Sequence, residues 1–307
     1  MITFFGLGSR SAGKVRGMQV SNLLKSNFYD FNNIPSNANI SKYVIFVRNR
    51  PSNGIEKELR RRGHIVGFDI IDNPVGDLLF RKIDPHMKNY VDDNSFDFYI
   101  TNSKNNTEEL KGYTENPIFT IPHHNCNFLN ERTCFGAQIK KVGYLGLPEQ
   151  NPYREEIDYF CKEIGLEYVC KNLKSRTECV DFLKTIHLGI NFIGKKRIEG
   201  GGVIFENKEN LAQDTIRKYK PCTKILNFQS FGIPSISSAY SSLDDFGGDS
   251  YMKVETLEEV KFQITKIVND NNFRKNMSEK SYLNGKTYNI ENIKNYYLEI
   301  PRYYQIK

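Results

Sequence analysis

The stretch KPCTKILNFQSFGIPSIS, residues 220–237, has the order of a short helix followed by a strand, which is typical of an α/β protein. Pro221 suits the first turn of a helix, because the N–H that proline lacks would not be needed for the helical ladder there. Leu226 and Phe228 are then expected to face the core, and Gly232 is expected to end the helix. The β-branched residues after the glycine predict a strand.

The start of this predicted helix carries groups that can bind an anion. Lys220 and Lys224 are four residues apart, so in a helix they lie on one face, and Thr223 precedes the second lysine. The first amides of a helix also favour an anion. The amides, the Thr223 hydroxyl and the two ammonium groups together predict a phosphate site.

The rest of the chain alternates short apolar runs with stretches of helical spacing. The apolar runs predict strands at 2–8, 43–48, 64–71, 96–101, 117–122, 140–146, 166–170, 187–193, 234–238 and 250–255. The helical spacing predicts helices at 15–26, 55–63, 74–82, 107–113, 152–164, 176–185, 221–230, 257–268, 271–283 and 290–300. Nearly continuous apolar strands that alternate with helices indicate parallel sheets covered on both faces.

The alternation is interrupted at 123–140, a stretch with little periodicity that is interpreted as a linker. The sequence therefore predicts an α/β fold with two doubly wound, Rossmann-like domains in tandem, residues 1–128 and 129–288. In such a protein a ligand is expected in the cleft between the domains, at the carboxyl ends of the strands.

The composition is that of an ordinary globular protein. The length of 307 residues suits two domains, and 39% hydrophobic with 26% charged residues excludes a disordered chain. The net charge of +7 suits a protein that handles phosphates, an anionic membrane surface or nucleic acid. Nucleic acid is disfavoured, because the densest basic runs, at 59–63 and 194–197, are too short to form a basic stripe.

The cysteines, histidines and paired aspartates do not predict a metal site. The six cysteines include no CxxC pair, the five histidines include no HExxH, and Asp244 and Asp245 are expected in a loop. The cysteines are therefore interpreted as reduced thiols of a cytosolic protein. The N-terminus does not resemble a signal peptide, and no run of about 18 apolar residues predicts a spanning helix. A cytoplasmic protein is expected, with association at the membrane surface left open.

Two further loops are candidates for phosphate contacts. GLGSRSAGKVRG (6–17) follows the first strand, and its glycines, with Gly8 and Ser9 at the strand end, would let backbone amides approach a ligand. The alternative is a tight turn between strand and helix, and the spacing does not match the dinucleotide-binding fingerprint. The second loop places three cations at a strand end, where they could neutralise a diphosphate leaving group. The alternative is a flexible polar loop without a binding role. These cations are Lys195, Lys196 and Arg197.

The acid–base candidates follow predicted strands of the first domain. His123 and His124 come at the end of the strand at 117–122, where they could act as acid, base or hydrogen-bond donors, although histidines are often structural. Asp69 and Asp72 end the strand at 64–71, and either could be a base that activates a hydroxyl. The alternative for Asp72 is a turn or a helix cap, because Asn73 and Pro74 follow it.

KPCTKILNFQSFGIPSISS resembles the donor-site segment of the GT-B glycosyltransferases, especially the large retaining group that uses nucleotide sugars. The pattern of that group runs K-P-x-x-K-L-x-E-x-x-A-x-G-x-P-V-I. Other segments resemble the family in the same order, although only residues 220–238 are specific. These segments are RGMQVSNLL (16–24), DFYITNS to PIFTIPHHNCNF (97–128), where the family has I-P-H-G-V-D, KVGYLG (141–146) and the last helix (290–300).

The resemblance implies a hexosyltransferase-like enzyme of the kind that acts in polysaccharide biosynthesis. The second domain would bind a nucleotide-diphosphate sugar and the first a glycan, lipid-linked or other hydroxyl acceptor, with a helix at about 289–307 packing back on the first. Lys220, Thr223 and Lys224 would hold the diphosphate or ribose, assisted by the cations at 195–197 and by the loop at 6–9. The expected outcome at the sugar is retention, with no metal and no other cofactor.

The chain departs from the family pattern at several positions. The family carries two glutamates with seven residues between them, which fall at Tyr219 and Asn227, and a glycine where this chain has His124. Asn227 can still hydrogen-bond a ribose hydroxyl, but it cannot act as a charged acceptor. Three alternatives therefore stay open: a non-catalytic protein that binds a nucleotide sugar or glycan, a nucleotide-sugar epimerase, and a DNA-modifying glucosyltransferase. An epimerase is expected to have additional carboxylates in the cleft. A DNA-modifying enzyme is expected to have a broader basic face than this sequence indicates.

Overall fold

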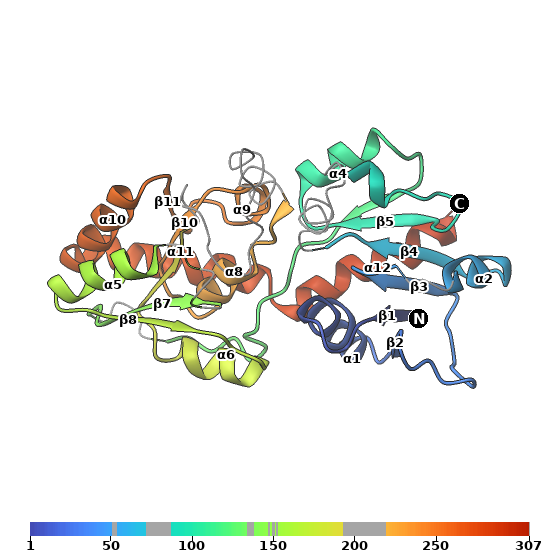
Figure 1. The fold of residues 1–307 in the computed structure, drawn as a ribbon, viewed down its shortest axis with the longest axis horizontal. Coiled ribbons are helices and arrows are strands. Elements are labelled where there is room, and N and C mark those ends of the chain that lie inside the picture. The colour runs from blue at the N-terminus through green and yellow to red at the C-terminus, as the bar shows by residue number, and fades with distance from the viewer. Residues whose placement is uncertain are drawn as a thin grey trace. The chain divides into compact units, whose positions relative to one another are not determined.

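The computed structural model describes residues 1–50, 54–71, 87–133, 138–146, 148, 151, 153–192 and 219–306. The chain forms two compact units, each built on its own sheet (Figure 1). The first unit contains the described residues of 1–123 together with 219–221 and 290–306. The second contains those of 124–192 and 222–289. The first boundary between the units falls after His123, whereas the sequence pattern places it after residue 128.

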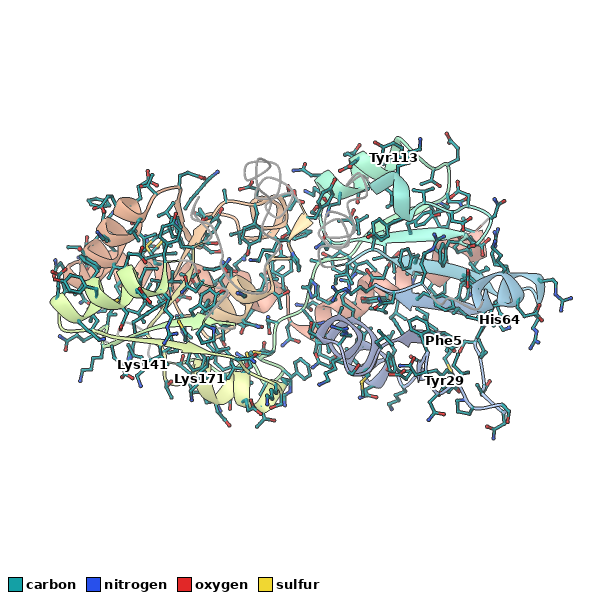
Figure 2. All side chains as sticks on the ribbon, viewed as in Figure 1. Phe5, Tyr29, His64, Tyr113, Lys141 and Lys171 are labelled. Atoms are coloured by element: carbon teal, nitrogen blue, oxygen red, sulfur yellow. The ribbon has the colours of Figure 1, made fainter. Side chains whose placement is uncertain are left out.

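The first unit has a sheet of six parallel strands in the order β2-β1-β3-β4-β5-β6. These strands are β1 (Ile2–Gly6), β2 (Phe28–Asp30), β3 (Tyr43–Val47), β4 (Ile65–Asp69), β5 (Phe98–Thr101) and β6 (Ile118–Thr120). Every residue of β1 and β3 is buried, which explains their continuous apolar sequences. In Figure 2, Phe5 of β1 and Tyr29 of β2 are neighbours, with ring centroids 5.6 Å apart. The strand order reverses between β1 and β3.

Helices of the first unit cover this sheet and include the C-terminal one. They are η1 (Gly13–Gln19, a π-helix), α1 (Val20–Leu23), α2 (Ile55–Arg61), η2 (Met87–Tyr90, a 3₁₀-helix), α4 (Lys104–Lys111) and α12 (Ile290–Ile306). The buried residues Ile290, Ile293, Tyr297 and Ile300 recur at helical spacing and form one face of α12. Tyr297 packs edge-on against Phe4 of β1, with ring centroids 5.7 Å apart. This apolar face therefore makes α12 part of the first unit (Figure 1).

The second unit has five parallel strands in the order β11-β10-β9-β7-β8. The strands are β7 (Lys141–Leu145), β8 (Glu167–Lys171), β9 (Leu188–Asn191), β10 (Ser235–Ser238) and β11 (Met252–Val254). The helices are α5 (Arg154–Glu163), α6 (Arg176–Leu183), α8 (Thr223–Ser230), α9 (Ser241–Phe246), α10 (Leu257–Asn269) and α11 (Asn271–Thr287). One hydrophobic cluster joins the sheet to α5 and α10, and another joins α6, α8 and α9. Helices thus cover both faces, and the strand order reverses between β7 and β9.

The predicted α/β class with two parallel, doubly wound sheets is confirmed. The helix predicted at 74–82 lies outside the described residues. Asp244 and Asp245 were expected in a loop, but they lie on α9, because the buried Leu243 and Phe246 dock this short helix on the core. None of the helices in the described ranges is both long and apolar enough to cross a bilayer.

Candidate functional site

Helix α8 is fixed to the sheet of the second unit by its apolar face. Leu226 and Phe228 are fully buried, as predicted. Gly189 of β9 lies directly under Phe228, since a Cβ at that position would be 2.4 Å from the ring. Gly232 adopts φ +73° just after the helix, which confirms it as the terminating glycine. Because only residues 231–234 join the C-terminus of α8 to the start of β10, the helix runs back along the sheet and its N-terminus lies toward the carboxyl edge.

Lys220 does not share a helical face with Lys224, so this part of the sequence prediction is wrong. Helix α8 begins at Thr223, and Lys220 precedes it as part of the first unit. The physical reason is the neighbouring Tyr219, which is buried in the core of the first unit. Its hydroxyl donates to the Glu109 carboxylate at 2.7 Å, which holds the residue before Lys220 in the first unit, and residues 220–222 are not helical.

Lys224 reaches from the first turn of α8 to the end of strand β7. Its Nζ donates to Tyr144 Oη at 2.8 Å and lies 4.1 Å from the centre of the Tyr144 ring. Burial raises the pKa of the Tyr144 phenol well above its usual value. The phenol therefore stays neutral, and it orients the Lys224 ammonium without cancelling its charge.

Gly146 makes room for this ammonium. It follows β7 with φ +141°, a conformation that favours glycine, and a Cβ there would lie 2.9 Å from Lys224 Nζ. The carboxyl end of β7 adjoins the reversal of strand order between β7 and β9, where doubly wound sheets bind their ligands. Lys224, Tyr144 and Gly146 thus place a positive charge at that edge. The sequence analysis did not identify Tyr144 and Gly146 as site residues. The one feature that could have indicated them is the glycine at the end of a predicted strand.

Thr223 and Asn227 flank Lys224 on α8. Thr223 is the first residue of the helix and is partly exposed, and Cys222 before it makes no side-chain cap. The Asn227 carboxamide faces the segment that enters the second unit. Its Oδ1 accepts from the Cys126 N–H at 2.9 Å, and its Nδ2 lies 3.9 Å from Cys179 Sγ. Asn227 therefore uses its side chain within the protein fold in this structure.

The glycine-rich loop after β1 is shaped mainly by packing. A Cβ at Gly13 would lie 2.2 Å from the Leu7 carbonyl oxygen, so glycine is required for the close approach of η1 to the loop. The Gly8 N–H donates to Asp30 Oδ2 at 2.7 Å, so this amide is not available to a phosphate in this structure. Ser9 is exposed at the same strand end.

Asp69 is not the base that the sequence suggested as one alternative. Both of its carboxylate oxygens accept from Arg16 of η1, at 2.9 Å and 3.0 Å, and both side chains are fully buried. The same guanidinium donates to the carbonyls of Ile121 and Pro122, at 2.8 Å and 3.0 Å. Asp69 is thus half of a buried ion pair that holds η1, β4 and the end of β6 together.

The two histidines lie inside the protein. His123, the last residue of the first unit before the boundary, is 5% exposed, and His124, the first of the second unit, is 2% exposed. The His124 ring lies 5.9 Å from the Phe128 ring.

The side chains of Asp72, Lys195, Lys196 and Arg197 lie outside the described residues. Within the described ranges, no group of three or more potential ligands from His, Cys, Asp and Glu is close enough to hold a metal ion.

No protein-family model matches the chain, and none of the curated protein sequences matches it significantly. Solved structures are similar over nearly its whole length. HepE from Anabaena, in complex with UDP and glucose, matches with TM-score 0.59 and 8% identity over 98% of this chain and 99% of its own. A glycosyltransferase from Rickettsia africae matches with TM-score 0.56 and 9% identity over 97% of each chain. Sucrose-phosphate synthase from Thermosynechococcus elongatus matches with TM-score 0.55 and 11% identity over 99% and 98%. The predicted architecture is therefore confirmed, and the chain has the GT-B glycosyltransferase fold.

Proposed function

We propose that this chain is a glycosyltransferase that moves a sugar from a nucleotide-diphosphate sugar to a hydroxyl group of an acceptor. The observation that carries the proposal is the Lys224 ammonium, oriented by Tyr144 at the carboxyl end of β7 beside Gly146. A fixed positive charge at this edge suits a diphosphate, whose negative charge grows as the glycosidic bond breaks. The GT-B fold and the similarity to HepE, which was solved with UDP-glucose, support the same reading.

The donor would be bound mainly by the second unit. Lys224 contacts the diphosphate, and the Thr223 hydroxyl and the first amides of α8 add neutral donors at the same end of the helix. Lys195, Lys196 and Arg197 are proposed to add further positive charge, and Asn227 a contact to the ribose after its side chain rearranges. These groups would stabilise the leaving diphosphate in place of a divalent cation, so neither a metal nor another cofactor is proposed.

The acceptor would be bound mainly by the first unit. His123, His124 and Asp72 are the proposed groups for positioning or deprotonating its hydroxyl. Gly8, Ser9 and Lys220 are instead proposed on the donor side, as further contacts to the diphosphate or ribose. A glycan or lipid-linked acceptor and retention at the sugar carbon are proposed on the resemblance to the retaining group. The positive net charge of +7 fits an acceptor presented at an anionic membrane surface.

Asn227 favours a second candidate, a protein that binds a nucleotide sugar without transferring it. Where the family pattern has a glutamate, this chain has a neutral amide, whose oxygen accepts a hydrogen bond from the Cys126 N–H. Binding through Lys224 would survive this replacement, whereas transfer would be lost if the missing carboxylate were essential.

A melting-temperature panel with UDP-, GDP-, ADP- and CMP-sugars tests the binding step. We expect one nucleotide class to raise the melting temperature, because a ligand that binds only the folded state stabilises it by about 2.7 kcal/mol at 100 times its Kd. Inorganic sulfate at matched ionic strength serves as the control for a nonspecific anion effect.

The same nucleotide sugar then tests transfer. Release of the free nucleotide, measured with and without EDTA in the presence of candidate acceptors, is expected to be catalysed and insensitive to EDTA. A melting shift without nucleotide release would support the non-catalytic candidate. If none of the four classes shifts the melting temperature, the proposed function is wrong.

Gly146→Ala is expected to weaken nucleotide-sugar binding and to cost about 1–3 kcal/mol of folding free energy. The methyl group would lie 2.9 Å from Lys224 Nζ and push the ammonium away, in addition to straining the backbone at φ +141°. Gly165→Ala is the matched control, because Gly165 also has a positive φ, of +74°, but no atom lies within 4 Å of its Cβ position. Equal affinities of the two variants, measured by titration calorimetry, would contradict the role of Gly146.

A further inference from the structure

Two cysteines of the second unit face each other next to helix α8. Cys126 lies in the segment that follows His124, and Cys179 lies in the second turn of α6. Their sulfur atoms are 3.7 Å apart, and both residues are partly exposed. A disulfide needs a sulfur–sulfur distance of about 2.05 Å, so a small movement of either side chain would bring the pair to bonding distance.

The surroundings hold the two thiols in this arrangement. Arg176, one helical turn before Cys179, donates to the Cys126 carbonyl at 3.1 Å, and its guanidinium lies 4.5 Å from the centre of the Phe128 ring. Asn227 bonds the Cys126 N–H and approaches the Cys179 sulfur. Contacts from α6 and α8 therefore fix both the backbone and the side chains of the pair.

The other described cysteines have different environments. Cys161 and Cys222 are buried in hydrophobic clusters. Cys170 lies on β8, with its sulfur 3.9 Å from Asn151 Nδ2. Cys126 and Cys179 thus form the one sulfur–sulfur contact that is recorded in the described part of the chain. Since the contact joins the entry segment of the unit to α6, a bond between them would cross-link two distant parts of the sequence.

We propose that Cys126 and Cys179 form a redox-active dithiol that closes reversibly to a disulfide by exchange with a small-molecule disulfide such as oxidised glutathione. The Cys179 thiolate attacks one glutathione sulfur, and the electron pair of the broken bond leaves with the other glutathione as its thiolate. The Cys126 thiolate then attacks Cys179 Sγ of the mixed disulfide and expels the second glutathione. Two protein thiols are oxidised, one glutathione disulfide is reduced to two thiols, and the two protons pass to the leaving thiolates.

The electrostatics assign the roles of the two thiols. The hydrogen bond from the Cys126 thiol lowers the pKa of Cys179, and the Arg176 charge acts in the same direction. The same hydrogen bond raises the pKa of Cys126, and burial raises it further. Cys179 is accordingly the attacking thiolate and Cys126 the resolving thiol.

Closure of the disulfide should also change the site around Lys224. Drawing the two sulfurs together must shift Asn227, which contacts both cysteine residues and lies one turn after Lys224 on α8. We expect the disulfide form to bind the nucleotide sugar more weakly. This consequence rests on the proposed function, whereas the disulfide itself does not.

The test is thiol mapping of the full-length chain equilibrated in glutathione buffers from fully reduced to fully oxidised. After alkylation, peptide mass spectrometry is expected to find a Cys126–Cys179 cross-link, a loss of these two free thiols, and their return with dithiothreitol. Cys126→Ser should accumulate the glutathione adduct on Cys179, whereas Cys179→Ser should leave Cys126 unmodified. Cys170→Ser, the matched control, should cross-link as the parent chain does.

Two outcomes would overturn the proposal. In the first, the parent chain keeps both thiols free in oxidised glutathione. In the second, Cys126 or Cys179 forms its main disulfide with a different cysteine of the chain. Circular dichroism checks that the serine variants fold, and the parent cross-link stands as a test even if they do not. Melting shifts with the nucleotide sugars are then compared between the reduced and disulfide forms. If the cross-link forms but no nucleotide sugar shifts the melting temperature of either form, the proposed function is wrong and the redox-active pair is still supported.

Discussion

Lys224→Ala is expected to weaken binding of the nucleotide-diphosphate sugar by about 10- to 100-fold. The variant removes a hydrogen bond to a charged group, which contributes about 1.5–3 kcal/mol, and each 1.4 kcal/mol changes Kd by about tenfold. Little loss of stability is expected, because the Lys224 side chain leaves α8 at its first turn while Leu226 and Phe228 keep the helix in the core. Titration calorimetry gives the affinity, and urea unfolding gives the stability.

Two variants separate the role of the Lys224 charge from other effects. Lys162→Ala removes an exposed lysine of the same unit, whose partner is Asp158 at 2.7 Å on the outside of α5, and the affinity should not change. Tyr144→Phe keeps the ring under the ammonium but removes the hydroxyl that accepts its hydrogen bond. An intermediate loss of affinity is expected for this variant. Unchanged affinity in Lys224→Ala would remove that lysine from the site, and with it the main support for the proposed function.

The fold could be predicted from the sequence because the buried parallel strands leave a strong pattern. The strands β1 and β3 are continuous apolar runs with every residue buried, and α10 begins with the capping box of Thr256 and Glu259. The edge strand β2 was missed, because it is three residues long and only partly buried. Such a strand is recognised by its hydrogen-bonded pairing with β1, and three residues are too few to show a periodic pattern in the sequence.

The candidate site was only partly predictable, for a similar reason. The position of Lys224 follows from local spacing in one helix, but the roles of Tyr144 and Gly146 depend on how α8 packs against β7. The error at Lys220 arose because nothing in the local sequence indicates that Tyr219 is buried in the other unit. Contacts between residues far apart in the chain therefore set the limit of sequence reasoning here.

The pairing of Arg16 with Asp69 leads to the prediction with the largest effect on stability. Arg16→Met is expected to cost about 3–5 kcal/mol of folding free energy, because it leaves a buried carboxylate without its guanidinium. It also removes the donors to the Ile121 and Pro122 carbonyls, at 2.8 Å and 3.0 Å. Urea unfolding followed by circular dichroism measures the loss. Hydrogen exchange of the β4 amides assigns it to the first unit.

Matched variants show whether this loss comes from a buried charge. Arg61→Met breaks an ion pair with Glu58 in which the arginine side chain is 74% exposed, and it should cost far less stability than Arg16→Met, because solvent screens an exposed pair. The double variant Arg16→Met with Asp69→Leu removes both buried charges and should recover much of the stability lost in the single variant. Asp69→Asn distinguishes the ion pair from a catalytic base. A base would lose transfer with unchanged stability, whereas half of a buried ion pair must lose stability first, because Arg16 would then be the uncompensated charge.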